Sequence, residues 1–243
     1  MEAEMIFSKH YTTNWHDTDA TRRVRASRLL VYMQETSNHH VMSIGMPLDE
    51  LRDKKGLAFI LSRLSLKIYR PLYAFEDIEV QTWTCPSRGF SSIRCFRILR
   101  DGEIVADAHS TWALVNINEK KFCRPSESGY AFDDEEPLTV ELPQRFRLPD
   151  GCELCEIGER RIVYSDLDYN MHMNNTHYPD MLCDFMPIDD VGRISGMVLS
   201  YLHEAAFGDT LSIGCCEHDG VYYFRTHSEK GDVCLEAQVF TEK

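Results

Sequence analysis

Hydrophobic and polar positions alternate along several stretches of this chain, and short turns containing glycine separate many of them. In the first half the alternating or apolar stretches cover residues 78–84, 91–100 and 103–116. In the second half they cover 210–217, 221–228 and 233–241. Asp101-Gly102 and Asp219-Gly220 are typical hairpin turns between such stretches. A period of two with these turns predicts antiparallel strands in both halves.

A segment of helical character comes before the strands in each half. In the first half, apolar side chains recur at helical spacings over 26–44, which predicts a helix there. The second helix is predicted over 175–186, with Pro179 weakening its first turns. A short strand-like run, at 11–15 and again at 161–164, precedes each helix.

Two short motifs occur in both halves and indicate an internal repeat. Asp17-Thr-Asp19 matches Asp166-Leu-Asp168, and both lead into the predicted helices. The second motif lies later in each half, in the stretch 66–80 and in the stretch 199–213. It is a Phe-x-Asp turn, found at 75–77 and at 207–209. The patterns in each half therefore predict a strand, a long helix and then four strands. This order is typical of an α+β unit in which a curved antiparallel sheet wraps around the helix.

The proline-rich stretch between the halves predicts a linker. It contains Pro137, Pro143 and Pro149 and an acidic run at 133–136. We expect an N-terminal unit over 1–128, a linker over 129–158 and a C-terminal unit over 159–243. One irregular α+β domain is the alternative.

Composition narrows the class of protein. The 243 residues are 43% hydrophobic and carry a net charge of −13, which argues against nucleic-acid binding and adsorption to anionic lipid. No apolar run approaches the roughly 20 residues that cross a bilayer, so membrane insertion is not expected. The start of the chain is acidic and lacks the apolar run of a secretory signal, so we expect a cytoplasmic protein.

The cysteines do not resemble a disulfide framework, because the nine residues are scattered and odd in number. Cys152 and Cys155 form a CxxC, but no second pair completes a zinc site. The favoured interpretation is that both are reduced linker thiols.

The densest polar string lies at 166–177. Asp168, Asn170 and His172 alternate, which places them on one side of an extended segment just before a helix, where unpaired backbone N–H groups can hold an oxyanion. Asp166, Asn174 and Asn175 are as well explained by turn and helix-cap roles.

The other half lacks this chemistry. At the matching positions it carries Asp19, Thr21 and Arg23, so only one half is equipped for catalysis.

Glu204 is a further candidate, since it lies at the end of a strand rich in apolar residues. Apolar neighbours would raise the pKa of this carboxyl toward the range of a general base. The residue matched to it in the first half is Leu72. A solvated strand end is the plainer interpretation.

Other chemistries are less well supported. No G-x-S-x-G nucleophile elbow occurs. Cys183 and Cys216 lie in the active half, but neither has a histidine within its motif. His39, His40, His172 and His177 do not have metal-ligand spacing, so no metal is expected.

The string Asp166-Leu-Asp-Tyr-Asn-Met-His-Met-Asn-Asn-Thr-His-Tyr resembles the D-x-D-x-N-x-H-x-N-N-x-x-Y signature of the acyl-acyl carrier protein thioesterases. Further segments are similar to the first domain of that family: Asn14-Trp-His-Asp-Thr-Asp, Phe59-Ile-Leu-Ser-Arg, Arg70-Pro, Thr111-Trp-Ala-Leu-Val-Asn and Arg124-Pro. The resemblance covers nearly the whole chain.

The resemblance implies a tandem double hot-dog fold and hydrolysis of the thioester between a fatty acyl chain and acyl carrier protein, without a cofactor. It implies a catalytic set of Asp168, Asn170, His172 and Glu204. The plant members carry Cys directly after that Glu, whereas this chain has Ala205. The difference favours direct attack by water, with Glu204 and His172 activating it, Asn170 steadying the oxyanion and Asp168 holding the segment.

The acyl chain and the carrier protein need surfaces of their own. Candidates for an apolar tunnel in the first unit are Leu29, Leu30, Met33, Met42, Ile44, Met46, Phe59 and Leu61. Carrier proteins are acidic, so a basic cluster is the natural docking surface. The first such cluster is Arg22, Arg23, Arg25 and Arg28, and the second is Lys120, Lys121 and Arg124.

Three rival functions share this fold. An acyl-CoA thioesterase would use the same four residues, a non-catalytic acyl-binding protein would need none of them, and a dehydratase is a weaker option. Because edge strands of such sheets often join, a homodimer is plausible.

Overall fold

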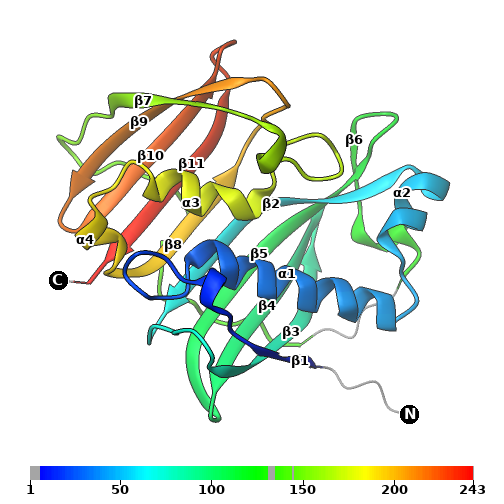
Figure 1. The fold of residues 1–243 in the computed structure, drawn as a ribbon. Coiled ribbons are helices and arrows are strands. Elements are labelled where there is room, and N and C mark those ends of the chain that lie inside the picture. The colour runs from blue at the N-terminus through cyan, green and yellow to red at the C-terminus, as the bar shows by residue number, and fades with distance from the viewer. Residues whose placement is uncertain (1–5, 131–134, 144, 243) are drawn as a thin grey trace.

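The computed structural model describes residues 6–130, 135–143 and 145–242 (Figure 1). The elements of the first half are β1 (Phe7–Thr12), α1 (Ala26–Ser43), α2 (Leu48–Lys55), β2 (Leu57–Ile68), β3 (Asp77–Arg88), β4 (Ser91–Arg100), β5 (Glu103–Asn116) and β6 (Lys121–Cys123). Two 3-10 helices, η1 (Trp15–Asp17) and η2 (Pro125–Ser128), also lie in this half.

The second half has the same plan. Its elements are β7 (Cys155–Arg161), η3 (Tyr164–Asp166), η4 (Asn175–His177), α3 (Tyr178–Cys183), α4 (Ile188–Val191), β8 (Ile194–Tyr201), β9 (Thr210–His218), β10 (Val221–Ser228) and β11 (Val233–Thr241). The predicted strands 91–100, 103–116, 221–228 and 233–241 agree with the observed ends.

All the described strands form one antiparallel sheet. The first half contributes β1-β3-β4-β5-β2, the second half contributes β8-β11-β10-β9-β7, and β6 pairs with β5. The second order is the first one reversed, so the halves are related by an approximate twofold axis between β2 and β8. At this central pair Leu64 lies opposite Leu199. The prediction of an α+β fold made of two tandem units is therefore confirmed.

The helices α1 and α3 lie against the same face of the sheet (Figure 1). Leu30 and Met33 of α1 are completely buried in a core shared with Leu66 of β2 and Leu182 of α3. Burying the apolar stripe of α1 against the sheet is the main stabilising contribution of this helix. The core thus holds the segment before each helix in a fixed position on the sheet.

The second helix is shorter than predicted. It begins as the 3-10 turn η4 and continues as α3 only to Cys183, whereas the prediction extended to Met186. Met186 precedes Pro187, and a residue before proline is disfavoured in the α conformation. Helix α2 was not predicted, because its eight residues are mostly charged and offer only Leu48 and Leu51 as an apolar pattern.

The structure corrects one alignment within the repeat. Val24 N donates to Leu72 O at 2.8 Å, and in the second unit Met173 N donates to Ala205 O at 2.8 Å. Leu72 therefore corresponds to Ala205, and the prediction that it corresponds to Glu204 is wrong by one position. The counterpart of Glu204 is Pro71.

A disulfide connects the stretch between the units to strand β9 of the second half. Cys152 is bonded to Cys216 of β9, with Cα atoms 6.3 Å apart, whereas Cys155 is free and exposed. The prediction of a reduced thiol is therefore wrong for Cys152, since the spacing of a CxxC carries no information about a distant partner. Strand β7 begins at Cys155, inside the predicted linker.

Among the described residues, no helix is both long and apolar enough to span a membrane. Residues 1–5, on which the absence of a secretory signal was argued, lie outside the described residues, as do positions 133 and 134 of the acidic run.

Candidate active site

Asp168 organises a tight turn that carries the predicted polar residues. Its Oδ1 accepts hydrogen bonds from the backbone N–H groups of Asn170 at 2.8 Å and His172 at 3.3 Å, and its Oδ2 accepts from Asn170 Nδ2 at 3.1 Å. Asp168 N donates to His172 O at 2.9 Å, and Met171 adopts a positive φ of 65°. The segment is therefore a closed turn, and the prediction of an extended segment is wrong; the side chains of Asp168 and Asn170 contact each other, and His172 joins them through its backbone N–H.

Glu204 reaches this turn from the loop after β8. Its Oε2 lies 3.4 Å from His172 Nε2. A short bridge between His172 and Ala206 holds the two segments side by side. The Glu204 side chain is 60% exposed and that of His172 is 32% exposed. The expected apolar surroundings of the carboxylate are therefore not found, and water has direct access to both groups.

The asparagines after the turn have structural roles. Asn174 Oδ1 accepts from Thr176 N at 3.0 Å and from Thr176 Oγ1 at 2.9 Å, so it caps η4. Asn175 Oδ1 accepts from Gln34 Nε2 of α1 at 2.7 Å. The cap uses one N–H group of the helix start, and the contact with Gln34 fixes the second unit's turn against the first unit's long helix.

A cavity of about 120 Å³, which we name the Tyr169 cavity, opens beside the turn. Tyr169 lies between Asp168 and Asn170 in sequence and is one of the lining residues. The others come from α1, α2, the loop between them and the strands β2, β4 and β5: Ser37, Asn38, Val41, Met46, Leu48, Leu51, Ala58, Phe59, Ser92, Arg94 and Trp112. The cavity therefore links the turn of the second unit that carries Asp168, Asn170 and His172 to the interior of the first unit.

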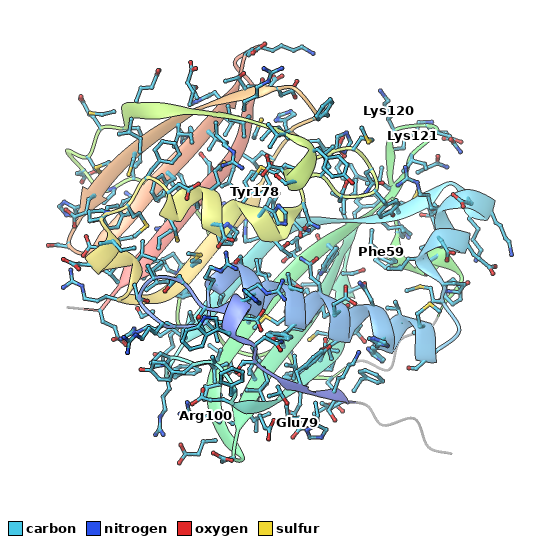
Figure 2. The ribbon with its side chains drawn as sticks, viewed as in Figure 1. Phe59, Glu79, Arg100, Lys120, Lys121 and Tyr178 are labelled. Atoms are coloured by element: carbon cyan, nitrogen blue, oxygen red, sulfur yellow. A yellow bond between two sulfur atoms is a disulfide. The ribbon has the colours of Figure 1, made fainter. Side chains whose placement is uncertain are left out.

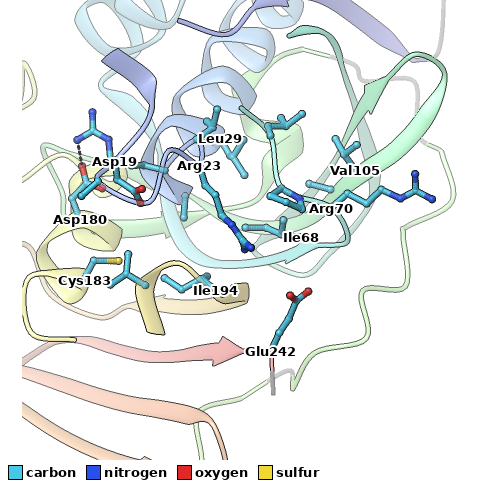
Figure 3. Close-up of a pocket in the computed structure, with 18 of the residues that line it drawn as sticks. Asp19, Arg23, Leu29, Ile68, Arg70, Val105, Asp180, Cys183, Ile194 and Glu242 are labelled. Carbon is cyan, nitrogen blue, oxygen red and sulfur yellow. Dashed lines mark hydrogen bonds and ion pairs between the residues drawn. The ribbon is translucent and has the colours of Figure 1, made fainter. Parts of the chain in front are cut away.

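The matching position of the first unit holds a different cavity, of about 310 Å³, which we name the Arg23 cavity. Asp19 N donates to Arg23 O at 3.0 Å, as Asp168 N does to His172 O. Arg23 reaches from its turn into the space between Ile68 and Ile194 (Figure 3). With Arg23 in place of the imidazole and Pro71 in place of the carboxylate, this turn lacks a hydrolytic pair.

The structure divides the six residues predicted to contact the acyl chain. Met46 and Phe59 line the Tyr169 cavity. Leu29 lines the Arg23 cavity. Leu30, Met33 and Leu61 belong to the main core and line neither cavity. Of the two extra candidates, Ile44 packs near Met46, whereas Met42 is 58% exposed and does not fit a tunnel wall.

The arginines predicted to dock the carrier protein do not form one free basic face. Arg28 Nε binds the buried Asp17 at 2.7 Å, and Arg25 Nη1 lies 3.4 Å from Asp180. Arg23 and Arg25 line the Arg23 cavity, away from His172 and Glu204. Only Arg22 of the four is exposed.

The surroundings of Cys183 and Cys216 do not favour either residue as a nucleophile. Burial raises the pKa of Cys183 to about 12, so its thiolate is scarce at neutral pH. Cys216 is in the disulfide. Within the part of the chain that the structure describes, no three His, Cys, Asp or Glu side chains are grouped to hold a metal ion.

The sequence did not predict three residues that lie at the cavity or contact the turn: Tyr169, Gln34 and Arg94. Tyr169 lies in the motif itself, yet its ring stands at a cavity wall with the Arg52 guanidinium 5.0 Å from the ring centroid. Only the fold brings α1 and β4 to this turn, so no local pattern could indicate the other two.

The chain contains two related α+β units, which is the arrangement of a double hot-dog protein. One of the two units carries the candidate active site, where the turn built on Asp168 faces the Glu204 carboxylate. The chain belongs to the acyl-ACP thioesterase family: the family's N-terminal domain matches residues 4–131 and its C-terminal domain matches residues 155–237.

Individual relatives agree with this assignment. The chain is 23% identical over 233 residues to oleoyl-acyl carrier protein thioesterase 2 of Arabidopsis thaliana, covering 86% of this chain and 62% of that protein, so it spans less than two thirds of this relative's length. A Bacteroides thetaiotaomicron acyl-ACP thioesterase structure superposes with a TM-score of 0.89 at 24% identity, covering 100% of both chains. The 12:0-ACP thioesterase from Umbellularia californica gives 0.86 at 20% identity, covering 98% of this chain and 97% of that one. The predicted double hot-dog fold is thus confirmed.

Proposed function

We propose that this chain hydrolyses the thioester of a fatty acyl group carried on acyl carrier protein, releasing the free fatty acid. The observation that carries the proposal is the 3.4 Å separation between His172 Nε2 and Glu204 Oε2, at the turn whose Tyr169 lines the Tyr169 cavity. The names of the relatives support the choice of an acyl-carrier substrate.

In the proposed first step, a water molecule held by Glu204 and His172 attacks the thioester carbonyl carbon. Glu204 takes a proton from this water as the new C–O bond forms. The half-exposed positions of both groups let water reach them directly. Ala205 follows Glu204 where the plant members carry a cysteine, and the proposed attack by water forms no covalent acyl-enzyme.

The negative charge that develops on the carbonyl oxygen needs a hydrogen-bond donor to stabilise it. Asn170 Nδ2 uses one N–H on Asp168 Oδ2, which leaves its second N–H for the oxyanion. Asp168 is a positioning residue, since it holds both the Asn170 amide and the His172 backbone. The intermediate then collapses, the C–S bond breaks, and the thiolate takes the proton from the Glu204–His172 pair.

The acyl chain would enter the Tyr169 cavity, where Phe59 and Met46 provide apolar contacts. The cavity lies between the catalytic turn and α1, so a chain attached to the reacting carbonyl has a direct path into the first unit. The amount of room near Met46 would then influence the preferred acyl length.

For the carrier protein we propose the second basic cluster, Lys120, Lys121 and Arg124, in place of the arginines at 22–28. Arg52 of α2 stacks on Tyr169, and Ile117 N donates at 2.9 Å to Gly56 O at the end of α2. The hairpin with Lys120 and Lys121 follows directly and projects outward (Figure 2). These cations therefore lie on the side of the catalytic turn, where an acidic carrier would approach.

The test is a direct comparison of substrates. The purified chain is assayed with one acyl group carried on acyl carrier protein and on CoA, and the free acid is quantified. We expect release of the acid with a higher kcat/KM for the carrier-linked form. A preference for CoA would favour an acyl-CoA thioesterase, and binding of the acid without any hydrolysis would favour a non-catalytic acyl-binding protein. The boundaries of the two units, a cytoplasmic location and a homodimer stay predictions.

A further inference from the structure

Part of the lining of the Tyr169 cavity is polar, which is unexpected for a site that takes a hydrocarbon chain. Ser92 and Arg94 both line the cavity, and they are two residues apart on β4, so their side chains share the face that points toward α1. The apolar part of the same cavity is larger, and it is supplied by Val41, Met46, Leu48, Leu51, Ala58, Phe59 and Trp112. A plain alkyl chain would therefore meet two polar groups.

The hydroxyl of Ser92 is buried and unpaired. Its Oγ has no hydrogen-bond partner among the described residues. A buried polar atom without a partner destabilises a folded protein, so such atoms are uncommon unless a ligand satisfies them. Ser92 thus offers both a donor and an acceptor to whatever occupies the cavity.

The guanidinium of Arg94 is a buried cation without a carboxylate partner in the described part of the chain. Arg94 is 6% exposed, and its Nη1 contacts His40 Nδ1 at 3.0 Å and Thr82 Oγ1 at 3.1 Å. Nε and Nη2 take part in none of the hydrogen bonds of the described residues. Burial lowers the pKa of Arg94 to about 10, so it remains charged at neutral pH. Among the described residues that line the cavity, Arg94 is also the only charged one.

We propose that the Tyr169 cavity selects acyl chains that carry an oxygen acceptor, a hydroxyl, oxo or carboxyl group, on the part of the chain that reaches Ser92 and Arg94. This inference rests on the proposed function and narrows its substrate class. An oxygen at that point would accept from the guanidinium and bond to the Ser92 hydroxyl, whereas a methyl group would leave the Ser92 hydroxyl without a partner and offer the guanidinium no acceptor.

The experiment uses carrier-protein thioesters of one chain length that end in a methyl, a hydroxyl or a carboxyl group. We expect kcat/KM for an oxygen-bearing chain to exceed that of the methyl chain by on the order of tenfold or more. An advantage confined to the hydroxyl chain indicates hydrogen bonding, and a larger one for the carboxyl chain indicates pairing with the cation. Equal rates, or faster hydrolysis of the methyl chain, would overturn the inference.

Variants separate the wall from the rest of the site. Ser92→Ala should reduce the advantage several-fold without lowering thermal stability, because the hydroxyl it removes has no partner. Ser91→Ala, on the opposite face of β4, is the matched control and should keep the advantage. Arg94→Lys retains the charge but loses the planar fork, and it should reduce the advantage as well. An advantage unchanged in both Ser92→Ala and Arg94→Lys would contradict the assignment.

A binding measurement keeps this inference separate from the proposed function. If no thioester is hydrolysed, the proposed function fails, and calorimetry with the three free acids decides the inference alone. Tighter binding of the hydroxyl or carboxyl acid, weakened by Ser92→Ala, supports it. Equal binding of all three acids overturns it.

Discussion

His172 Nε2 lies 3.4 Å from Glu204 Oε2, although the two residues come from separate segments of the second unit. The turn built on Asp168 presents the imidazole, and the loop after β8 presents the carboxylate. In the first unit the same backbone turn is present without either group. The backbone turn is therefore shared by both units, and the imidazole and the carboxylate are present in only one of them.

The basic hairpin should matter more for the carrier protein than the arginine cluster does. Reversing Lys120 and Lys121 to Glu should raise KM for acyl-carrier substrate several-fold, with a weaker salt dependence, because both exposed cations follow the segment bound to the end of α2, whose Arg52 stacks on Tyr169. Arg22→Glu, at the other turn, is the control and should change KM little. A larger effect from Arg22→Glu would restore the original docking prediction.

Cys183 should be dispensable for the chemistry. Its pKa, raised by burial to about 12, keeps the thiol protonated at neutral pH. Cys183→Ala should therefore retain kcat to within about twofold, since a protonated buried thiol is not a nucleophile. Steady-state assays at pH 7 and pH 9 measure this. A large loss of kcat in a folded variant would show that the mechanism needs the thiol.

The Asp17–Tyr32 hydrogen bond should give stability a defined pH window. Burial alone would raise the pKa of Asp17, but hydrogen bonds from Tyr32, Asn14 and Arg28 outweigh it and lower the pKa below 3.8. Its contribution is thus present above about pH 4 and lost as the pH falls through the native pKa. Burial and Asp17 raise the pKa of Tyr32 from 10.0 to about 12. The stabilising contribution of the Tyr32 hydroxyl is therefore lost as the pH rises from 10 to about 12.

Unfolding by denaturant at several pH values measures the window. At pH 7 Tyr32→Phe should lower the free energy of unfolding by about 1–3 kcal/mol, because the buried carboxylate loses a donor. The difference between variant and wild type should shrink below pH 4. A difference that stays constant from pH 3 to pH 7 would disprove the link to Asp17.

The disulfide should stabilise the stretch between the units. It closes a sequence separation of 64 residues, and Cys216→Ser should lower the free energy of unfolding by about 2–4 kcal/mol. Cys215→Ser, at the neighbouring free cysteine, is the control. Titration of thiols in denaturant should leave Cys152 and Cys216 unreactive until a reductant is added. Reaction of both without reductant would contradict the bond.

Much of the fold could be predicted because the hairpin turns mark where one strand ends and the next begins. Asp101 and Gly102 both adopt positive φ, as do Asp219 and Gly220, which is what a tight hairpin needs and what Asp-Gly sequences favour. Helix α2 gave no such signal, since its contact with the core rests chiefly on Leu51. The one-position error at Leu72 arose because the Phe-x-Asp letters match one residue away from the backbone equivalence.

The residues of the proposed catalytic set could be picked out from the sequence, but their geometry could not. Asp168, Asn170 and His172 are too many polar residues for a cap, yet their convergence depends on the positive φ of Met171, which the sequence does not indicate. The exposure of Glu204 depends on where the chain leaves β8. The polar wall at Ser92 and Arg94 lies on a strand whose neighbours are fixed only by the complete sheet.

The central claim is that Glu204 and His172 act as one unit on a single water molecule. A double-mutant cycle with Glu204→Gln, His172→Ala and the double variant, measured as kcat on acyl-carrier substrate, tests it most directly. We predict that each single change lowers kcat by roughly 10²–10⁴-fold with unchanged thermal stability, and that the double variant loses little more than the worse single one. Near-normal kcat for Glu204→Gln, or losses that simply multiply, would contradict the claim.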